Sequence, residues 1–192
     1  MNNLSPLHIY ILAHLSKANI DYAKSIAKVL KTEQSIVDQA LKELEDIKII
    51  ERSHGSSIKR TKARFKLSHE VHKHHTYYKL TKEGELLLRE IKKDFSAYLT
   101  DLVENEKTLE ILKFLRKAKH EHVKQIAKVF SLQIDEARSI ITKLLSFGLI
   151  AECKTKLLKR KHRRAKPKKE TRTQHKYYKL SRLSELLLRF FC

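Results

Sequence analysis

Cysteine, glycine, proline and tryptophan are scarce in the 192-residue chain, which contains two, three, two and none of them. Because the two cysteines, Cys153 and Cys192, lack the spacing of metal ligands, both are interpreted as ordinary thiols and no disulfide framework is expected. So few glycines leave no Gly-rich phosphate loop. No paired carboxylates near a histidine and no nucleophile motif are found either, so the sequence predicts neither an enzyme nor a cofactor.

Long apolar runs are also missing. No stretch of about 18 apolar residues is present that would span a membrane. The first ten residues, MNNLSPLHIY, have neither the basic start nor the apolar core of a signal peptide. The sequence therefore predicts a cytoplasmic protein.

Acidic residues are too few to balance the basic ones. The chain has 42 Lys and Arg against 22 Asp and Glu, a formal net charge of +20. A charge of this size exceeds what solubility needs and indicates a polyanionic partner, which is DNA, RNA or an anionic membrane surface. A membrane is disfavoured because the charge does not follow one face of a helix.

A repeat of one hundred residues organises the chain. Every position aligns with the position one hundred residues later without a gap, and about 27 of the 92 aligned pairs are identical. The clearest matches are Ile-Ala-Lys-Val at 26–29 and 126–129, Tyr-Tyr-Lys-Leu at 77–80 and 177–180, and Glu-Leu-Leu-Leu-Arg at 85–89 and 185–189. The sequence therefore predicts two copies of one domain, residues 1–100 and residues 101–192.

Hydrophobic periodicity predicts three helices at the start of each copy. Apolar residues recur at helical spacing over residues 7–15, and again from Leu109 to Leu115. Asp21 is expected to cap a short second helix, and Thr32 a third. Two short helices separated by a very short turn are typical of a helix-turn-helix.

A β-hairpin and a fourth helix are expected to follow. The runs Ile47–Arg52 and Tyr77–Thr81 predict its two strands, with Ile50 opposite Tyr78. Because neighbouring residues of a strand face opposite ways, one of Tyr77 and Tyr78 is expected in the core and the other at the surface. Thr81, or Ser181 in the second copy, is expected to cap the leucine-rich helix that follows.

These motifs carry a family resemblance. The segments Gly148–Ile150 and Tyr77–Gly84, with the leucines that follow, resemble the closing half of MarR-, ArsR- and PadR-like winged helices. The resemblance implies an α+β, mainly α fold of two tandem winged helix-turn-helix domains, each with a long β-hairpin wing. A tandem chain rich in Lys and Ile is also similar to uncharacterised archaeal winged-helix proteins. Ser184 departs from the pattern, since the family usually has glycine there.

The connection between the copies contains one Gly and no Pro over residues 82–104. The last helix of the first copy is therefore expected to continue through Phe95, Leu99 and Val103 and to break near Asn105. Terminal helices form the subunit interface of many winged-helix dimers, so this connection predicts an intramolecular pseudo-dimer with a fixed mutual orientation. A homodimer of the whole chain stays open.

Nearly all of the excess charge lies in the two predicted wings. Residues 52–79 carry about +7 and residues 153–179 about +12, so the helical bodies are nearly neutral. Arms of about a dozen residues would reach roughly 40 Å, and their Lys and Arg suit contact with phosphates. A merely solvated hairpin or a disordered basic loop is the alternative. The predicted nucleic-acid-binding residues are Lys59, Arg60, Lys62, Arg64, Lys66, Lys154, Lys156, Lys159, Arg160, Lys161, Arg163, Arg164, Lys166, Lys168, Lys169 and Arg172.

The expected recognition helix of the first copy does not suit ordinary base reading. Residues 32–46 contain five acidic residues and one lysine, which a phosphate-lined major groove would repel. The second copy is neutral over the equivalent residues. Polar side chains that could still touch base edges are Gln34, Gln39, Gln133, Ser139 and Thr142. Alternatively, these helices face a protein partner or water.

Histidines gather on the return arm of the first wing, at positions 69, 72, 74 and 75. Alternate residues of a strand share a face, so a zinc site is conceivable. It is not expected, because the second copy keeps only His175 and no cysteine lies near. Contact with phosphates, or stacking on bases, is the preferred interpretation of these side chains.

The favoured function is a DNA-binding transcription regulator or chromatin factor that contacts phosphates through its wings. An RNA- or ribosome-associated protein that binds rRNA through the same hairpins is the alternative. A protein-interaction module is a third class. The corresponding location is the nucleoid or the ribosome.

Overall fold

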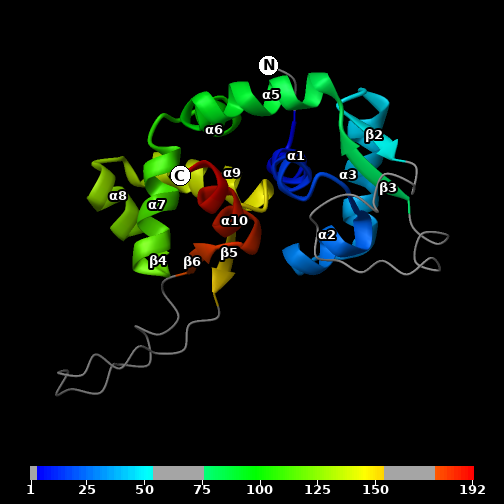
Figure 1. The fold of residues 1–192 in the computed structure, drawn as a ribbon. Helices are drawn as coiled ribbons and strands as arrows, with labels where there is room; N and C mark the ends of the chain where they lie inside the picture. The colour runs from blue at the N-terminus through cyan, green and yellow to red at the C-terminus, as the bar shows by residue number, and fades with distance from the viewer. Residues whose placement is uncertain (1–3, 54–75, 154–175) are drawn as a thin grey trace. The chain divides into compact units, whose positions relative to one another are not determined.

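The computed structural model describes residues 4–53, 76–153 and 176–192 (Figure 1). The chain forms two compact units, and the boundary falls between Asp94 and Phe95. Each unit is mainly helical and contains one small antiparallel sheet of three strands. The units repeat the same order of elements, which confirms an α+β, mainly α architecture built from a duplicated sequence.

The first unit begins with a helix, a two-residue strand and two further helices, and closes with two strands and a helix. Its elements are α1 (Pro6–Ala18), β1 (Asp21–Tyr22), α2 (Ala23–Leu30), α3 (Gln34–Asp46), β2 (Ile50–Ser53), β3 (Tyr77–Leu80) and α5 (Lys82–Lys93).

The second unit repeats this order after one additional helix at its start. Its elements are α6 (Phe95–Val103), α7 (Thr108–Ala118), β4 (Glu121–His122), α8 (Val123–Phe130), α9 (Ile134–Ser146), β5 (Ile150–Cys153), β6 (Tyr177–Leu180) and α10 (Arg182–Phe191).

Equivalent side chains form the two cores. In the first unit α1 packs against α3, α5 and β3, and the largest fully buried side chains include Leu12, Leu15 and Leu44. Their counterparts Leu112, Leu115 and Leu144 are equally buried in the second unit. Burying such apolar side chains is the main stabilising contribution to each unit.

The sheet of each unit places the strand that returns from the predicted wing in the centre. In the first unit the order is β1-β3-β2, and Ile50 lies opposite Leu80. The predicted pairing of Ile50 with Tyr78 is therefore wrong by two residues. The turn after α3 sets the register, because the Thr81 N–H donates to the Ile49 carbonyl at 3.1 Å.

That turn needs a residue with left-handed backbone conformation. Lys48 adopts φ 62° in the first unit, and Gly148 adopts φ 65° at the equivalent position of the second. Glycine adopts such angles without the steric penalty that a side chain brings. The predicted strand from Ile47 is accordingly shorter, since it begins only at Ile50.

The helix ends confirm two of the predicted caps and correct two others. Thr81 and Ser181 accept hydrogen bonds from the N–H groups of Gly84 and Ser184, as expected of N-caps. Asp21 instead belongs to β1, so α2 begins after Tyr22. Glu33 takes the position before α3 that was assigned to Thr32.

The helix expected to join the two copies is interrupted. α5 ends at Lys93, Asp94 adopts φ −141° and ψ 75°, and α6 begins at Phe95. Aspartate is a poor former of helix interiors, and α6 packs on α7 and α9 rather than continuing α5. The prediction of one continuous helix is wrong, whereas its end near Asn105 is confirmed by the end of α6 at Val103.

Tyr77 and Tyr78 are both buried, so the expectation that one lies at the surface is wrong for the first unit. Tyr77 is 4% exposed and Tyr78 is 9% exposed. The missed strand β1 explains this, because its Tyr22 ring packs on Tyr77 with 5.2 Å between ring centroids. Tyr177 is half-buried in the second unit, where His122 takes the place of Tyr22.

Candidate nucleic-acid interface

All sixteen predicted contact residues lie within residues 54–75 and 154–175, outside the described residues. The histidines considered for zinc lie there too. By sequence these two segments carry about +5 and about +10. The first segment joins β2 to β3, and the second joins β5 to β6. Each basic segment is therefore attached to the body of its unit by a pair of described antiparallel strands.

Neighbouring acids neutralise Arg52 and Lys79 in the first strand pair and Lys176 beside the second. The exposed Lys179 of β6, by contrast, forms no ion pair with another described residue. Arg52 lies opposite Tyr78 and forms a bidentate ion pair with Glu45, with nitrogen–oxygen distances of 2.7 and 3.0 Å. This pairing raises the pKa of Arg52 above its usual value. Lys79 pairs with Glu51 at 2.8 Å, and in the second unit Lys176 pairs with Glu152 at 3.3 Å. The excess positive charge therefore begins beyond these paired residues.

The exposed face of α3 is acidic and internally hydrogen-bonded. Gln34 donates to Asp38 at 3.2 Å, and Gln39 donates to Glu43 at 2.9 Å. Glu43 also accepts from His8 of α1 at 2.9 Å. Both glutamines are exposed, as base-reading side chains would have to be, but each has its amide turned to a carboxylate. This face suits a phosphate-lined groove poorly.

The equivalent face of α9 carries a different set of contacts. Arg138 pairs with Asp135 at 2.9 Å, and the Thr142 hydroxyl donates to the Arg138 carbonyl at 2.9 Å. Lys143 donates to the Val103 carbonyl at 3.1 Å and to Glu104 at 2.7 Å. Lys143 therefore anchors the end of α6, whereas the Arg138 side chain is 65% exposed.

A row of lysines on α2 was not predicted from the sequence. Lys24, Lys28 and Lys31 are all exposed, and none forms an ion pair with another described residue. The spacing of four residues places Lys24 and Lys28 on one face of α2, which is the signal that could have identified them, and Lys31 follows as the C-cap of the helix. The second unit keeps Lys124 and Lys128 at the equivalent positions.

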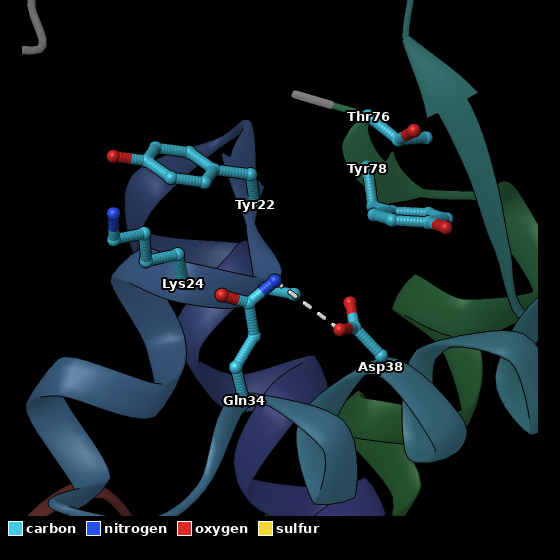
Figure 2. Close-up of a pocket in the computed structure, with 7 residues that line it drawn as sticks. Tyr22, Lys24, Gln34, Asp38, Thr76 and Tyr78 are labelled. Atoms are coloured by element: carbon cyan, nitrogen blue, oxygen red, sulfur yellow. Dashed lines mark hydrogen bonds between the residues drawn. The ribbon is translucent and has the colours of Figure 1, made fainter. Parts of the chain in front are cut away.

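A polar hollow of about 180 Å³ opens beside this row (Figure 2). Four elements supply its lining, namely the end of β1, the start of α2, the first turns of α3, and β3 with the residue before it. Figure 2 shows Tyr78 above Asp38 and Tyr22 across from them. The lining residues are Tyr22, Ala23, Lys24, Gln34, Asp38, Thr76 and Tyr78. Sequence reasoning missed this site because its residues come together only in the folded unit.

Another polar cluster contains the residue types of a catalytic triad, but its hydrogen bonds link them in a different order. Asp21 accepts from His14 at 2.6 Å and from the Ser25 hydroxyl at 2.9 Å. In a nucleophilic triad the histidine must take the proton of the hydroxyl. Here the carboxylate lies between them, so the cluster ties α1 to β1 and α2 and does not activate Ser25. The second unit has Phe114, Glu121 and Gln125 at these positions.

Two further kinds of site are absent from the described ranges. Among these residues no group of three or more His, Cys, Asp or Glu side chains could hold a metal ion. None of the helices in the same ranges is both long and apolar enough to cross a membrane.

Among solved structures, the chain aligns at a low TM-score with a protein of Lactococcus lactis. Two mutants of Lactococcus lactis ZitR align with TM-scores of 0.37 and sequence identities of 18% and 23%. The alignments cover 76% and 61% of this chain, and 73% and 74% of the other. A comparison with curated proteins finds no match.

A family model matches the chain twice, over residues 2–91 and residues 99–191. Each match covers one copy of the repeat and one structural unit, with the break between matches close to the boundary at Asp94. The chain therefore belongs to the family described as uncharacterized proteins conserved in archaea (DUF2250).

Proposed function

We propose that the chain is a nucleic-acid-binding protein of two tandem winged-helix domains, residues 1–100 and 101–192, whose wings contact phosphates. The observation that carries the proposal is the concentration of positive charge in segments 54–75 and 154–175, whereas acids pair with Arg52, Lys79 and Lys176 beside them. Lys and Arg in such segments gain affinity by releasing counterions from the backbone of the nucleic acid.

Duplex DNA is the favoured target, and the role is that of a transcription regulator or chromatin factor in the cytoplasm, associated with the nucleoid. The order of helices and strands in each unit supports the winged-helix assignment, in which α3 and α9 would be the recognition helices. The acidic face of α3 argues that general affinity comes from the wings and not from base reading by this helix. Binding to RNA or to the ribosome is the alternative that the experiment separates.

The test changes charge at the second wing and at a matched set of surface sites. Replacing Arg160, Lys161, Arg163 and Arg164 by Gln removes four charges from segment 154–175. The control replaces four exposed lysines of the helical bodies by Gln, namely Lys82, Lys93, Lys113 and Lys117. Affinity is measured by fluorescence anisotropy on random-sequence duplex DNA and on double-stranded RNA.

The wing variant is expected to bind every duplex more weakly, and its salt slope should shrink by about 0.9 for each phosphate that the variant no longer neutralises. The control variant should lose much less affinity although its net charge is the same. Equal losses in the two variants would show that only the total charge matters. Tighter binding to RNA than to DNA at equal salt would select the RNA alternative.

A further inference from the structure

We propose that the hollow between α2, α3 and β3 of the first unit binds one unpaired guanine base, in a nucleic-acid strand or in a free nucleotide. Binding of a guanine within a nucleic-acid strand rests on the proposed function and adds a base preference to it. Its residues are separate from the wing segments, since Asp38, Gln34, Lys24 and the two tyrosines all lie in the described first unit.

The hydrogen-bonding groups of the hollow match guanine. Asp38 accepts from the Gln34 amide at 3.2 Å through one oxygen, which orients the carboxylate and leaves acceptor capacity on both oxygens. The Gln34 carbonyl oxygen adds another acceptor. Guanine is the only common base with two adjacent N–H donors on its Watson–Crick edge, so a fixed carboxylate pairs with guanine better than with the other three.

Aromatic rings border the place where the base would lie. Tyr22 and Tyr78 both line the hollow, and Figure 2 shows the Tyr78 ring edge-on above Asp38 with Tyr22 on the other side. Tyr78 is 9% exposed, so its ring can border a base but offers little face for the stacking that unpaired bases make on exposed aromatic rings. The tyrosines would therefore border the base, while Asp38 and Gln34 distinguish its edge.

The positive charge of Lys24 favours a nucleotide over a cationic peptide as the ligand of the hollow. An arginine side chain also offers two parallel donors to a carboxylate, but Lys24 lines the same hollow, and its positive charge disfavours a second cation there. A nucleotide has a phosphate that Lys24 attracts, and Lys28, one turn further along α2, and Lys31 at the C-cap offer further phosphate contacts. This placement lets the phosphates of a strand lie along the lysines of α2 while the base reaches Gln34 and Asp38 at the start of α3.

The second unit does not reproduce the site. At the positions of Gln34, Asp38 and Thr76 it has Ile134, Arg138 and Lys176. These residues remove the acceptors and add positive charge, which suits phosphate contact and not a guanine edge. Base recognition therefore belongs to the first unit alone.

The test compares guanine with adenine in the full-length chain. Fluorescein-labelled strands of nine nucleotides, all uridine except a central G or A, are titrated by anisotropy, with thymidine strands as the DNA equivalent. GMP and AMP are titrated separately by ligand-observed NMR, which does not depend on the wings. The expected preference for G over A is between about 5-fold and 100-fold.

Asp38→Asn is the diagnostic variant, because an amide offers one acceptor and one donor in place of two acceptors. The preference for G should fall to about 1-fold in this variant while the affinity for the A strand changes little. Asp46→Asn is the matched control, since it removes the same charge from the exposed end of the same helix outside the hollow. It should keep the full preference for G.

Different failures have different signatures. No preference for G in either strands or mononucleotides, or an unchanged preference in Asp38→Asn, would overturn the guanine site. Displacement of GMP by N-acetyl-arginine amide at equal concentration would replace it by a peptide site. A preference for GMP without one for strands supports the site with a free nucleotide as ligand. Failure of every strand and duplex to bind at low salt would refute the proposed function, whereas the GMP titration would still report on the hollow.

Discussion

Gly84 and Ser184 occupy equivalent positions and solve the same packing problem differently. A Cβ on Gly84 would lie 2.2 Å from the Ile49 carbonyl oxygen, so no side chain fits there without movement of the backbone. In the second unit Ser184 is 1% exposed, and its hydroxyl donates to the equivalent carbonyl of Leu149 at 2.6 Å. Where the winged-helix pattern has glycine, the second copy has Ser184. The close approach of backbone atoms seen at Gly84 is thus replaced by a buried hydrogen bond in the second unit.

His8 links the start of α1 to α3 and should make stability depend on pH. Its Nδ1 accepts from the Ser5 N–H at 3.2 Å and therefore carries no proton, while its Nε2 donates to Glu43 at 2.9 Å. Burial lowers the pKa of His8, although Glu43 acts in the opposite direction. In the folded state His8 is accordingly neutral at pH 7.

Because the folded pKa lies below the unfolded value of 6.5, the unfolded state binds the proton more readily. The stabilising contribution of His8 is complete above pH 6.5 and is lost as pH falls from there through the folded pKa. Urea unfolding at a series of pH values should show a smaller loss between pH 7.5 and pH 5 in His8→Gln than in the unchanged chain. Parallel pH profiles for the two proteins would show that His8 does not titrate differently on folding.

The N-cap residues of α5 and α10 differ in the number of hydrogen bonds by which they join each helix to the turn before its sheet. The Thr81 hydroxyl accepts from the Gly84 N–H at 3.1 Å and donates to the carbonyls of Lys48 and Ile49 at 2.9 and 3.0 Å. Ser181 also accepts, from the Ser184 N–H at 3.2 Å, but the Leu149 carbonyl has its donor in Ser184. Thr81 therefore serves both the helix and the turn.

We expect Thr81→Ala to lower the free energy of unfolding of the first unit by about 2 kcal/mol, through removal of a cap and of one further hydrogen bond. Ser181→Ala should cost the second unit about 1 kcal/mol. Urea unfolding followed by circular dichroism measures both, and Thr81→Ser serves as the control that keeps the hydroxyl. Equal losses for the two alanine variants would contradict the double role of Thr81.

Helices with strong periodicity were predictable from the sequence, and features set by contacts between elements were not. The pattern over residues 7–15 predicts α1 because its apolar side chains recur at helical spacing. β1 has only two residues, too few to show any period, and its absence from the prediction led to the wrong placement of Tyr77. The pairing of Ile50 depends on the turn at Lys48, which residue patterns in the strands do not reveal.

The candidate sites divide in the same way. Sequence alone locates the basic segments, because charge is a property of composition, and their sixteen contact residues stay a prediction. The hollow requires α2, α3 and β3 to meet, and its chemistry depends on the hydrogen bond between Gln34 and Asp38. The row of lysines on α2 was visible as a spacing but needed the observed exposure to be recognised.

Across the whole molecule, charge is divided between neutral bodies and basic segments. The described residues together carry only about +5 of the +20, and the rest belongs to residues 54–75 and 154–175. Acids already neutralise the cations nearest to these segments, as the Arg52–Glu45 and Lys79–Glu51 pairs show. Duplication has thus kept the neutral framework in both copies while the second copy gained most of the charge.

This division predicts a steep dependence of duplex affinity on salt. If six or more phosphates are contacted, the association constant should fall by about 10³-fold or more between 50 and 200 mM salt. The slope should be shared unequally between the copies, because segment 154–175 has eleven Lys and Arg against six in segment 54–75. Replacing all eleven Lys and Arg of the second segment should therefore flatten the salt dependence more than replacing all six of the first. Affinity that barely changes over this range would exclude binding dominated by phosphates, and equal flattening on neutralising each whole segment would show that the segments make equal numbers of contacts.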